Sequence, residues 1–279
     1  DVVGFDINPM SHWIVREEIE HINLPAYRRA AQRLRRDLEQ QLGGLYRTRC
    51  LSCGRDGASV KYFLWVKTKD CAECGATVDL FPGYLVSEDA RHPKNVFVCA
   101  ACGELTECED GKNPGLCSHC SAPVRIDGPA KRGHCECSHC HATVHYPDPL
   151  AGPPRHRMFA IEYYCPGCKH GHKGRFFKRP GVTDLERFAR AEALLAETEI
   201  RLAPDDAIPS GDETDRLHKW GYRKYREMFN ARQLLGLELS AQWVAAHADE
   251  RTQHALATNL SDLLRYQNML CRYDTMALK

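Results

Sequence analysis

The sequence lacks a long apolar run, an excess of one charge and a secretory leader. No stretch approaches the ~18 consecutive apolar residues of a membrane-spanning helix, so we expect no membrane partner. The formal net charge is +1 over 279 residues, which argues neither for nor against nucleic acid. The first residues contain no basic or apolar leader region and no initiator Met. This start predicts an internal part of a longer, cytoplasmic protein.

Cysteine is the residue present in excess, with 15 Cys beside 14 His. Twelve of the cysteines form six C-x-x-C pairs between residues 50 and 168. Secreted domains rarely space disulfide cysteines in this way, so a cytosolic metal-binding segment is the better interpretation. The pairs are Cys50/Cys53, Cys71/Cys74, Cys99/Cys102, Cys117/Cys120, Cys137/Cys140 and Cys165/Cys168.

Two C-x-x-C turns together supply the four thiolates that a tetrahedral zinc ion takes. Joining each pair to its neighbour along the chain leaves 17, 14 and 24 residues between the joined pairs. Four thiolates leave no open coordination position, so we expect about three structural zinc ions and no hydrolytic chemistry. Interleaved pairing and iron stay open as alternatives. The predicted sites are Cys50/Cys53/Cys71/Cys74, Cys99/Cys102/Cys117/Cys120 and Cys137/Cys140/Cys165/Cys168.

Other cysteines and histidines near these pairs are expected not to be ligands. Cys108, Cys135 and Cys271 are interpreted as ordinary thiols, although Cys135 could substitute as a ligand because it precedes Cys137 by two positions. Exposed loop positions are the expected places of His119, His134, His139, His141, His145, His170 and His172.

The two ends of the chain are predicted to be helical, and the middle to consist of short strands stapled by metal. At the start, a β-prone run over 2–5 ends at Asp6, and Asn8 caps a helix beginning at Pro9. The further predicted helices are Pro25–Leu42, Asp184–Leu202, Trp220–Phe229, a helix after Asn230 whose Gln233 completes a capping box, and about Arg251–Cys271. Strands are predicted over Val60–Val66 and Phe97–Val98. Burial is expected for the stripes Leu234, Leu237, Ala241, Val244, Ala245 and Leu256, Leu260, Leu263, Leu264, Leu270.

The opening segment Val3–Pro9, with the sequence VGFDINP, resembles the second conserved strand of class I S-adenosylmethionine-dependent DNA methyltransferases. In those enzymes an acid at the end of this strand accepts hydrogen bonds from the cofactor ribose. The resemblance makes Asp6 the candidate cofactor-binding residue. A carboxylate suits this role because it can accept from two hydroxyl groups at once, as in dinucleotide-binding folds.

Two helical blocks, Trp220–Leu235 and Leu264–Asp274, resemble the zinc-ribbon adenine-specific DNA methylase family, in which a zinc-ribbon segment follows the second methylase strand. The resemblance implies an α+β fold. Its parts are a fragment of a Rossmann-like methyltransferase strand–helix unit (residues 1–22), a helical connector (23–49), a multi-zinc-ribbon insertion of short β-hairpins (50–180) and a C-terminal helical region (181–279).

Two parts of the family pattern are missing. The chain has no glycine-rich cofactor loop and no catalytic Asp/Asn-Pro-Pro-Tyr/Phe tetrapeptide, since neither Asp148-Pro149-Leu150 nor Asn8-Pro9-Met10 has the second proline. We therefore expect no catalytic residue here, and S-adenosylmethionine to be bound by the parent protein.

Two basic clusters are candidates for DNA contact, because cations beside aromatic side chains suit phosphate binding and base stacking. Residues 50–180 carry 17 Lys/Arg and 14 Asp/Glu. Three zinc ions on twelve thiolates add six negative charges to this formal +3, which makes the segment −3, so any DNA contact must be local. The clusters are Lys173, Arg175, Lys178 and Arg179 around Phe176 and Phe177, and Arg223, Lys224 and Arg226 with Trp220, Tyr222 and Tyr225.

The first functional hypothesis is the central segment of a DNA adenine methyltransferase of a restriction–modification or defence system, whose ribbons recognise DNA or give structural support. The alternatives are a non-catalytic zinc-ribbon module that binds nucleic acid, and a zinc-stapled scaffold that binds other restriction or defence proteins.

Overall fold

The computed structural model describes residues 4–5, 7–90 and 92–276. Helices and small antiparallel sheets coexist in it, so the fold is α+β, as predicted. The chain divides into two compact units. The helical unit takes in residues 1–45, 188–205 and 228–271, and the strand unit takes in residues 46–187, 206–227 and 272–279.

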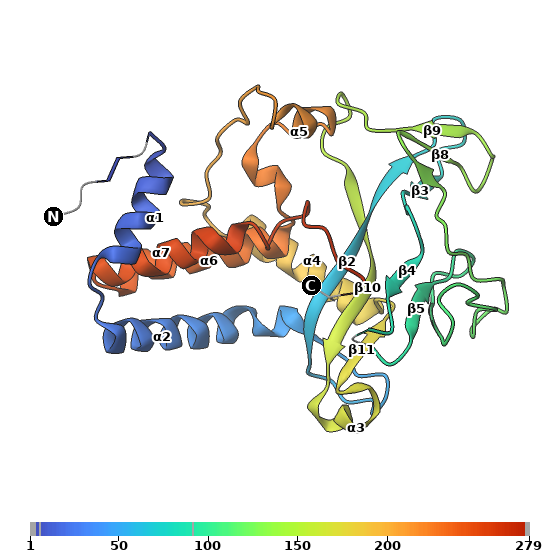
Figure 1. Ribbon diagram of the computed structural model, residues 1–279, viewed down its shortest axis with the longest axis horizontal. Coiled ribbons are helices and arrows are strands. Elements are labelled where there is room, and N and C mark those ends of the chain that lie inside the picture. The colour runs from blue at the N-terminus through green and yellow to red at the C-terminus, as the bar shows by residue number, and fades with distance from the viewer. Residues whose placement is uncertain (1–3, 6, 91, 277–279) are drawn as a thin grey trace. The chain divides into compact units, whose positions relative to one another are not determined.

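The helical unit is built on four helices whose sequences contain their own start signals. The side chains of Asn8, Asn23, Asn230 and Asp249 each accept a hydrogen bond from a backbone N–H in the first helical turn. A small apolar core of Ala30, Trp243, Val244 and Leu256 joins three of these helices. The helices are α1 (Pro9–Ile19), α2 (Leu24–Leu42), α6 (Ala231–His247) and α7 (Glu250–Leu264) (Figure 1). Helix α4 (Val182–Glu197) has residues in both units.

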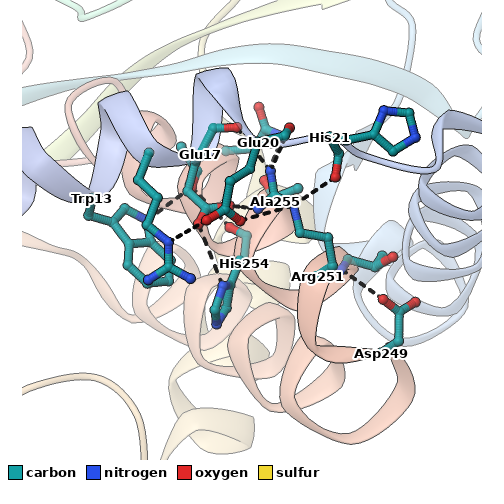
Figure 2. A network of polar contacts seen from close by, with 12 residues as sticks. Trp13, Glu17, Glu20, His21, Asp249, Arg251, His254 and Ala255 are labelled. Carbon is teal, nitrogen blue, oxygen red and sulfur yellow. Dashed lines mark hydrogen bonds and ion pairs between the residues drawn. The ribbon is translucent and has the colours of Figure 1, made fainter. Parts of the chain in front are cut away.

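Helix α1 is held to α7 by polar contacts rather than by its apolar side. Arg251 donates to the Glu17 carboxylate and to the backbone carbonyls of Glu17, Glu20 and His21 (Figure 2). The Trp13 indole donates to Thr258 at 3.1 Å. The apolar residues on the rest of the helix are exposed, including Met10, Ile14, Val15 and Ile19.

The predicted helix starts lie within two residues of the observed ones except at Trp220, where no helix begins, and several of the predicted ends are wrong. Helix α4 stops at Glu197 because the backbone N–H groups of Arg201, Leu202 and Ala203 turn to the buried carboxylate of Glu238. Trp220–Phe229 is mostly not helical: α5 (Asp215–Lys219) precedes it and only a 3-10 turn, η3 (Tyr225–Met228), lies within it. Helix α7 ends at Leu264, seven residues before the predicted end.

Burial on α6 and α7 also differs from the predicted stripes. On α6 the buried side chains are Arg232, Leu235, Glu238, Ser240, Trp243 and Val244, so polar residues share the inner face. Ala245, Leu263, Leu264 and Leu270, which we expected to be buried, are exposed. Gly4 and Phe5 are not in a strand, and the rest of the strand predicted at the start lies outside the described residues.

The strand unit is organised by one long antiparallel pair, β2 (Ala58–Asp70) and β10 (Arg155–Tyr164), which Figure 1 shows as adjoining arrows. The predicted strand Val60–Val66 is the middle of β2. The sheet is completed by β1 (Arg47–Thr48) and β3 (Thr77–Asp79) on β2 and by β11 (Arg175–Lys178) on β10. At ~3.3 Å per residue, the 13-residue β2 separates what lies at its two ends by about 40 Å.

Two small three-stranded sheets lie in the chain between β2 and β10. The first, which contains the predicted strand Phe97–Val98, packs its Val96, Phe97 and Val98 into one apolar core with Leu64 of β2 and Ala160 of β10. The sheets are β4 (Leu85–Ser87), β5 (Asn95–Val98) and β6 (Leu105–Cys108), then β7 (Ala130–Lys131), β8 (His134–Glu136) and β9 (Thr143–His145). None of the described helices combines the length and the apolarity needed to cross a bilayer.

Candidate metal centres

Five of the six C-x-x-C motifs fold into the same tight turn. In each, the fifth residue donates its backbone N–H to the carbonyl of the first cysteine at 2.9 Å. That fifth residue takes a positive φ, which glycine adopts without a steric penalty. The residues in this place are Gly54, Gly75, Gly103, Ser121 and His141, with φ between 61° and 73°. The sequence signal of glycine after cysteine is therefore confirmed, and Ser121 and His141 take the same conformation without it.

The sixth motif, Cys165/Cys168, is built differently. A 3-10 turn, η2 (Pro166–Cys168), runs into the short helix α3 (Lys169–His172), and the chain then reverses through Lys173 and Gly174, both with positive φ. The motif thus leads directly into β11 and the edge of the main sheet.

The structure brings the twelve cysteines together in three groups of four, and the pairing is nested rather than sequential. Only Cys99/Cys102/Cys117/Cys120, here named the inner group, follows the predicted pairing of neighbours. The prediction was wrong for the other two groups. These are the outer group, Cys50/Cys53/Cys165/Cys168, and the middle group, Cys71/Cys74/Cys137/Cys140.

The reason for nesting is the register of β2 with β10. Cys50 and Cys53 precede β2 while Cys165 and Cys168 follow β10, and antiparallel pairing brings these two flanks to the same end of the sheet. Cys71, at the other end of β2, meets the segment that leads back into β10. Sequence spacing alone cannot reveal this order, because β10 is far from β2 along the chain.

The sulfur positions fit a tetrahedral metal ion. Zinc–sulfur bonds of ~2.3 Å in a tetrahedron place neighbouring sulfurs about 3.8 Å apart. The Sγ–Sγ distances are 3.8 and 3.9 Å in the outer group, 3.6 and 3.7 Å in the middle group, and 3.7 Å for both pairs of the inner group. Each group could therefore hold a metal ion, and its four thiolates would close the coordination sphere.

The pKa values of the thiols also favour a bound metal ion. Backbone N–H groups of Cys140 and His139 lower the pKa of Cys137 to about 6. In the outer group, the neighbouring thiol of Cys53, followed by burial and Cys165, raises the pKa of Cys168 to about 12. In the middle group itself, the backbone N–H of Ala142 favours the Cys140 thiolate, but the thiol of Cys74, burial and Cys71 outweigh it and raise the pKa of Cys140 to about 12. One thiolate of the middle group is thus stabilised while another beside it is not. A divalent cation removes this conflict, since it favours all four ligands in the ionised form.

The cysteines outside the pairs do not join these groups. Cys135 is fully buried against Val78 and Val144 beside the middle group, and its Sγ donates to the Glu136 carbonyl. Its expected alternative role as a ligand is therefore wrong in this arrangement. Cys108 is half-buried and Cys271 is exposed. Six of the seven histidines expected at exposed positions are exposed; His172 is not, being half-buried.

The predicted DNA-contact cluster after the outer group is largely engaged within the fold. Lys178 is buried and its Nζ lies 2.8 Å from Asp184 and 3.0 Å from Thr48. Arg175 donates through Nε to the buried Glu162 at 2.6 Å, and Arg179 pairs with Glu104 at 3.0 Å. The interpretation of Lys178 as a phosphate contact is thus corrected, because its ammonium group does not reach the surface. Lys173 is exposed.

The second predicted cluster is partly structural as well. Arg223 donates to the carbonyls of Pro149, His218 and Tyr222, and so joins two loops of the strand unit. Gly221 has a φ of +82°, and a Cβ there would lie 2.2 Å from the Gly152 carbonyl oxygen. Lys224 is half-buried. Close packing against the 149–152 loop therefore explains why part of the Trp220–Leu235 block has this sequence.

A basic surface that the sequence analysis did not assemble surrounds the outer group. Arg49, Arg55, Lys169 and Lys173 are exposed, and Asp56 is the acidic residue among them. The Arg49 guanidinium lies next to Gly54, and that of Arg55 lies next to Gly167 in the opposite turn. We name Arg49, Arg55, Lys169 and Lys173 the outer basic patch. Its two halves are more than 100 residues apart, so only the nested pairing could have revealed it.

The candidate cofactor residue Asp6 lies outside the described residues, so its role stays a prediction. Comparison of the chain with protein-family models, curated proteins and solved structures finds no match.

Proposed function

We propose that this chain is the zinc-stabilised, non-catalytic part of an S-adenosylmethionine-dependent DNA adenine methyltransferase, and that its outer basic patch contacts DNA. The observation that carries the DNA contact is the exposure of four cations around a closed four-cysteine group. About three structural zinc ions hold the strand unit, and the outer ion fixes the backbone from which Lys169 and Lys173 extend.

Phosphate contact is the chemistry that this patch favours. Lysine and arginine side chains displace counterions from the duplex, and each contact adds to the affinity without reading sequence. A methyltransferase must also hold the duplex around an extruded base, and an added module can supply that grip. The zinc groups themselves have no open coordination position, so the chemistry of methyl transfer belongs to other parts of the parent protein.

Helix α1 supports the methyltransferase context. It follows the segment that resembles the cofactor-binding strand, and its polar side, with Glu17 and Trp13, already packs on α7. Its other side exposes Met10, Ile14, Val15 and Ile19, which is the reverse of an ordinary surface helix. The occupant we assign to this face is the Rossmann-like sheet of the parent enzyme.

The DNA contact is tested with the zinc-loaded chain and a labelled duplex, by fluorescence anisotropy at several salt concentrations. Changing Arg49, Arg55, Lys169 and Lys173 to Ala should weaken binding and reduce the slope of log K against log salt by roughly 0.9 per lost contact. The matched control is Lys112→Ala with Arg125→Ala, two exposed cations near the inner group. Equal salt slopes for both variants and the original chain would move the DNA surface elsewhere and favour the protein-interaction scaffold.

The cofactor role of Asp6 is tested in the full-length parent by calorimetry. Asp6→Ala should weaken S-adenosylmethionine binding by about 1–3 kcal/mol, the cost of leaving buried hydroxyl donors unpaired. Asp1→Ala, five residues earlier in the chain, is the control. Unchanged affinity in Asp6→Ala would reject the ribose contact and leave the DNA-binding proposal standing.

A further inference from the structure

Three side chains from separate parts of the strand unit converge at a place that the cysteine groups do not explain. His92 lies in the loop before β5, Glu107 lies on β6, and His172 ends α3. The Nε2 atoms of both imidazoles lie 3.8 Å from Oε1 of Glu107. One possible ligand atom from each residue lies within 4.8 Å of the other two.

His92 is already held in the protonation state that a metal ligand needs. Its Nδ1 lies 2.8 Å from the Lys94 carbonyl oxygen, and this contact, shorter than the 3.4 Å from the Lys94 N–H to the same atom, favours the tautomer in which Nδ1 carries the proton. Nε2 then keeps its lone pair. This atom is buried, the side chain is 0 % exposed, and no described residue offers it a hydrogen bond. A ring N–H bonded to a backbone carbonyl, with the other nitrogen directed at a ligand position, is the usual arrangement of a metal-binding histidine.

The surroundings are apolar on one side and open on the other. Phe177 lies edge-on to His92 at 5.3 Å, and Phe176 lies edge-on to His172 at 5.1 Å. Burial lowers the pKa of His92, which keeps its imidazole neutral. The Glu107 side chain is 39 % exposed, so an ion can enter from solvent along the carboxylate.

We propose that His92, Glu107 and His172 form a fourth metal site, which takes a divalent transition ion such as zinc through two imidazoles and one carboxylate. Bonds of about 2.0–2.1 Å place tetrahedral ligands roughly 3.4 Å apart, so the 3.8 Å distances must close by a few tenths of an ångström. The two imidazoles are stacked at 5.0 Å with an interplanar angle of 8°. His172, which is 25 % exposed, therefore turns about its side-chain bonds to direct a nitrogen at the ion.

This site differs from the cysteine groups in chemistry and in position. Three protein ligands leave a coordination position for water, so binding is weaker and exchangeable. Its ligands also join two zinc-stapled segments: Thr106, next to Glu107, bonds a sulfur of the inner group, and His172 follows the outer group by four residues. Occupation would cross-link the inner ribbon to the end of the main sheet.

The test is titration of zinc chloride into chain that already carries its tightly bound zinc, followed by calorimetry and elemental analysis. The original chain should take up one further, weaker ion that a mild chelator removes while the tightly bound ions remain. His172→Ala and Glu107→Gln should each weaken this uptake at least tenfold. His170→Ala, an exposed histidine on the same short helix, is the matched control and should leave it unchanged.

Two results would overturn the proposal. One is the absence of further uptake in the original chain, which would leave the stacked imidazoles as packing only. The other is equal uptake in the original chain and all three variants, which would assign it to surface histidines. Should His172→Ala also lose a tightly bound ion through misfolding of α3, Glu107→Gln decides alone, because it keeps the shape of an exposed side chain. None of these outcomes depends on DNA binding.

Discussion

The inner and outer cysteine groups contain the same four ligands and nearly the same sulfur distances, yet they are built on opposite principles. The inner group closes over 14 residues between Cys102 and Cys117, whereas 111 residues lie between Cys53 and Cys165 of the outer group. Local turns are sufficient for the first. The second exists only because β2 and β10 pair along their length. A ligand motif therefore predicts that a site exists, and the sheet decides which motifs share it.

Their charges differ as well. Glu104, Glu107, Glu109 and Asp110 lie in the chain between the two cysteine pairs of the inner group, whereas the outer group is surrounded by the cations of the outer basic patch. A zinc ion on four thiolates would give each group a formal charge of −2, which the patch would offset at the outer group and the acids would reinforce at the inner one. This contrast favours the outer group as the place of phosphate contact.

The largest expected effect comes from removing ligands in pairs, because each zinc contributes on the order of 10 kcal/mol to folding. By elemental analysis the original chain should carry three tightly bound zinc ions. Cys53→Ser with Cys165→Ser removes two ligands of one group and should leave two ions. Cys53→Ser with Cys71→Ser removes one ligand from each of two groups and should leave one ion.

Sequential pairing would give the opposite order for these double variants, with two ions left in Cys53→Ser/Cys71→Ser. The control variants are Cys108→Ser and Cys135→Ser, which lie outside the three groups and should leave all three ions bound.

The part of this architecture that the sequence predicts is the local part. The six turns, the positive φ after Cys53, Cys74 and Cys102, and the capping box of Asn230 and Gln233 follow from short-range chemistry. The helix end at Glu197 does not, because it depends on Glu238, a side chain 41 positions further on. The nested groups and the His92/Glu107/His172 cluster could not be predicted from the sequence for the same reason, since tertiary contacts rather than spacing bring their members together.

A smaller difference in stability is expected between variants of two neighbouring cations, Lys178 beside the outer group and Arg179, which contacts the inner group. Lys178, after the outer group, is buried with Asp184 and Thr48, and loss of one partner from a buried pair costs about 3–5 kcal/mol. Lys178→Met should lower the urea midpoint of the zinc-loaded chain accordingly. Arg179 reaches the inner group through an exposed pair with Glu104, so Arg179→Ala should cost about 1 kcal/mol or less.

Adding Asp184→Leu to Lys178→Met tests the cause, since the double variant removes both charges of the buried pair and leaves only the half-buried Arg187, 3.5 Å from Asp184, without its carboxylate. It should recover part of the lost stability. Equal urea midpoints for Lys178→Met and Arg179→Ala would contradict the buried pair and indicate that Lys178 is exposed.

The smallest expected effect lies within the inner group, whose two turns differ at one position. Gly103 and Ser121 have φ of 73° and 61° in equivalent places. A residue with a Cβ pays roughly 1–2 kcal/mol in this conformation, whereas glycine loses up to about 1 kcal/mol more chain entropy on folding. Ser121→Gly should therefore stabilise the chain by less than about 1 kcal/mol, and Gly103→Ala should destabilise it by a similar amount. A Cβ at residue 103 would meet only the Arg179 side chain, at 3.7 Å, so the Gly103→Ala effect reports the backbone conformation. Thermal unfolding of the zinc-loaded variants measures both, and a change of the same sign in the two would show that the turns are not equivalent.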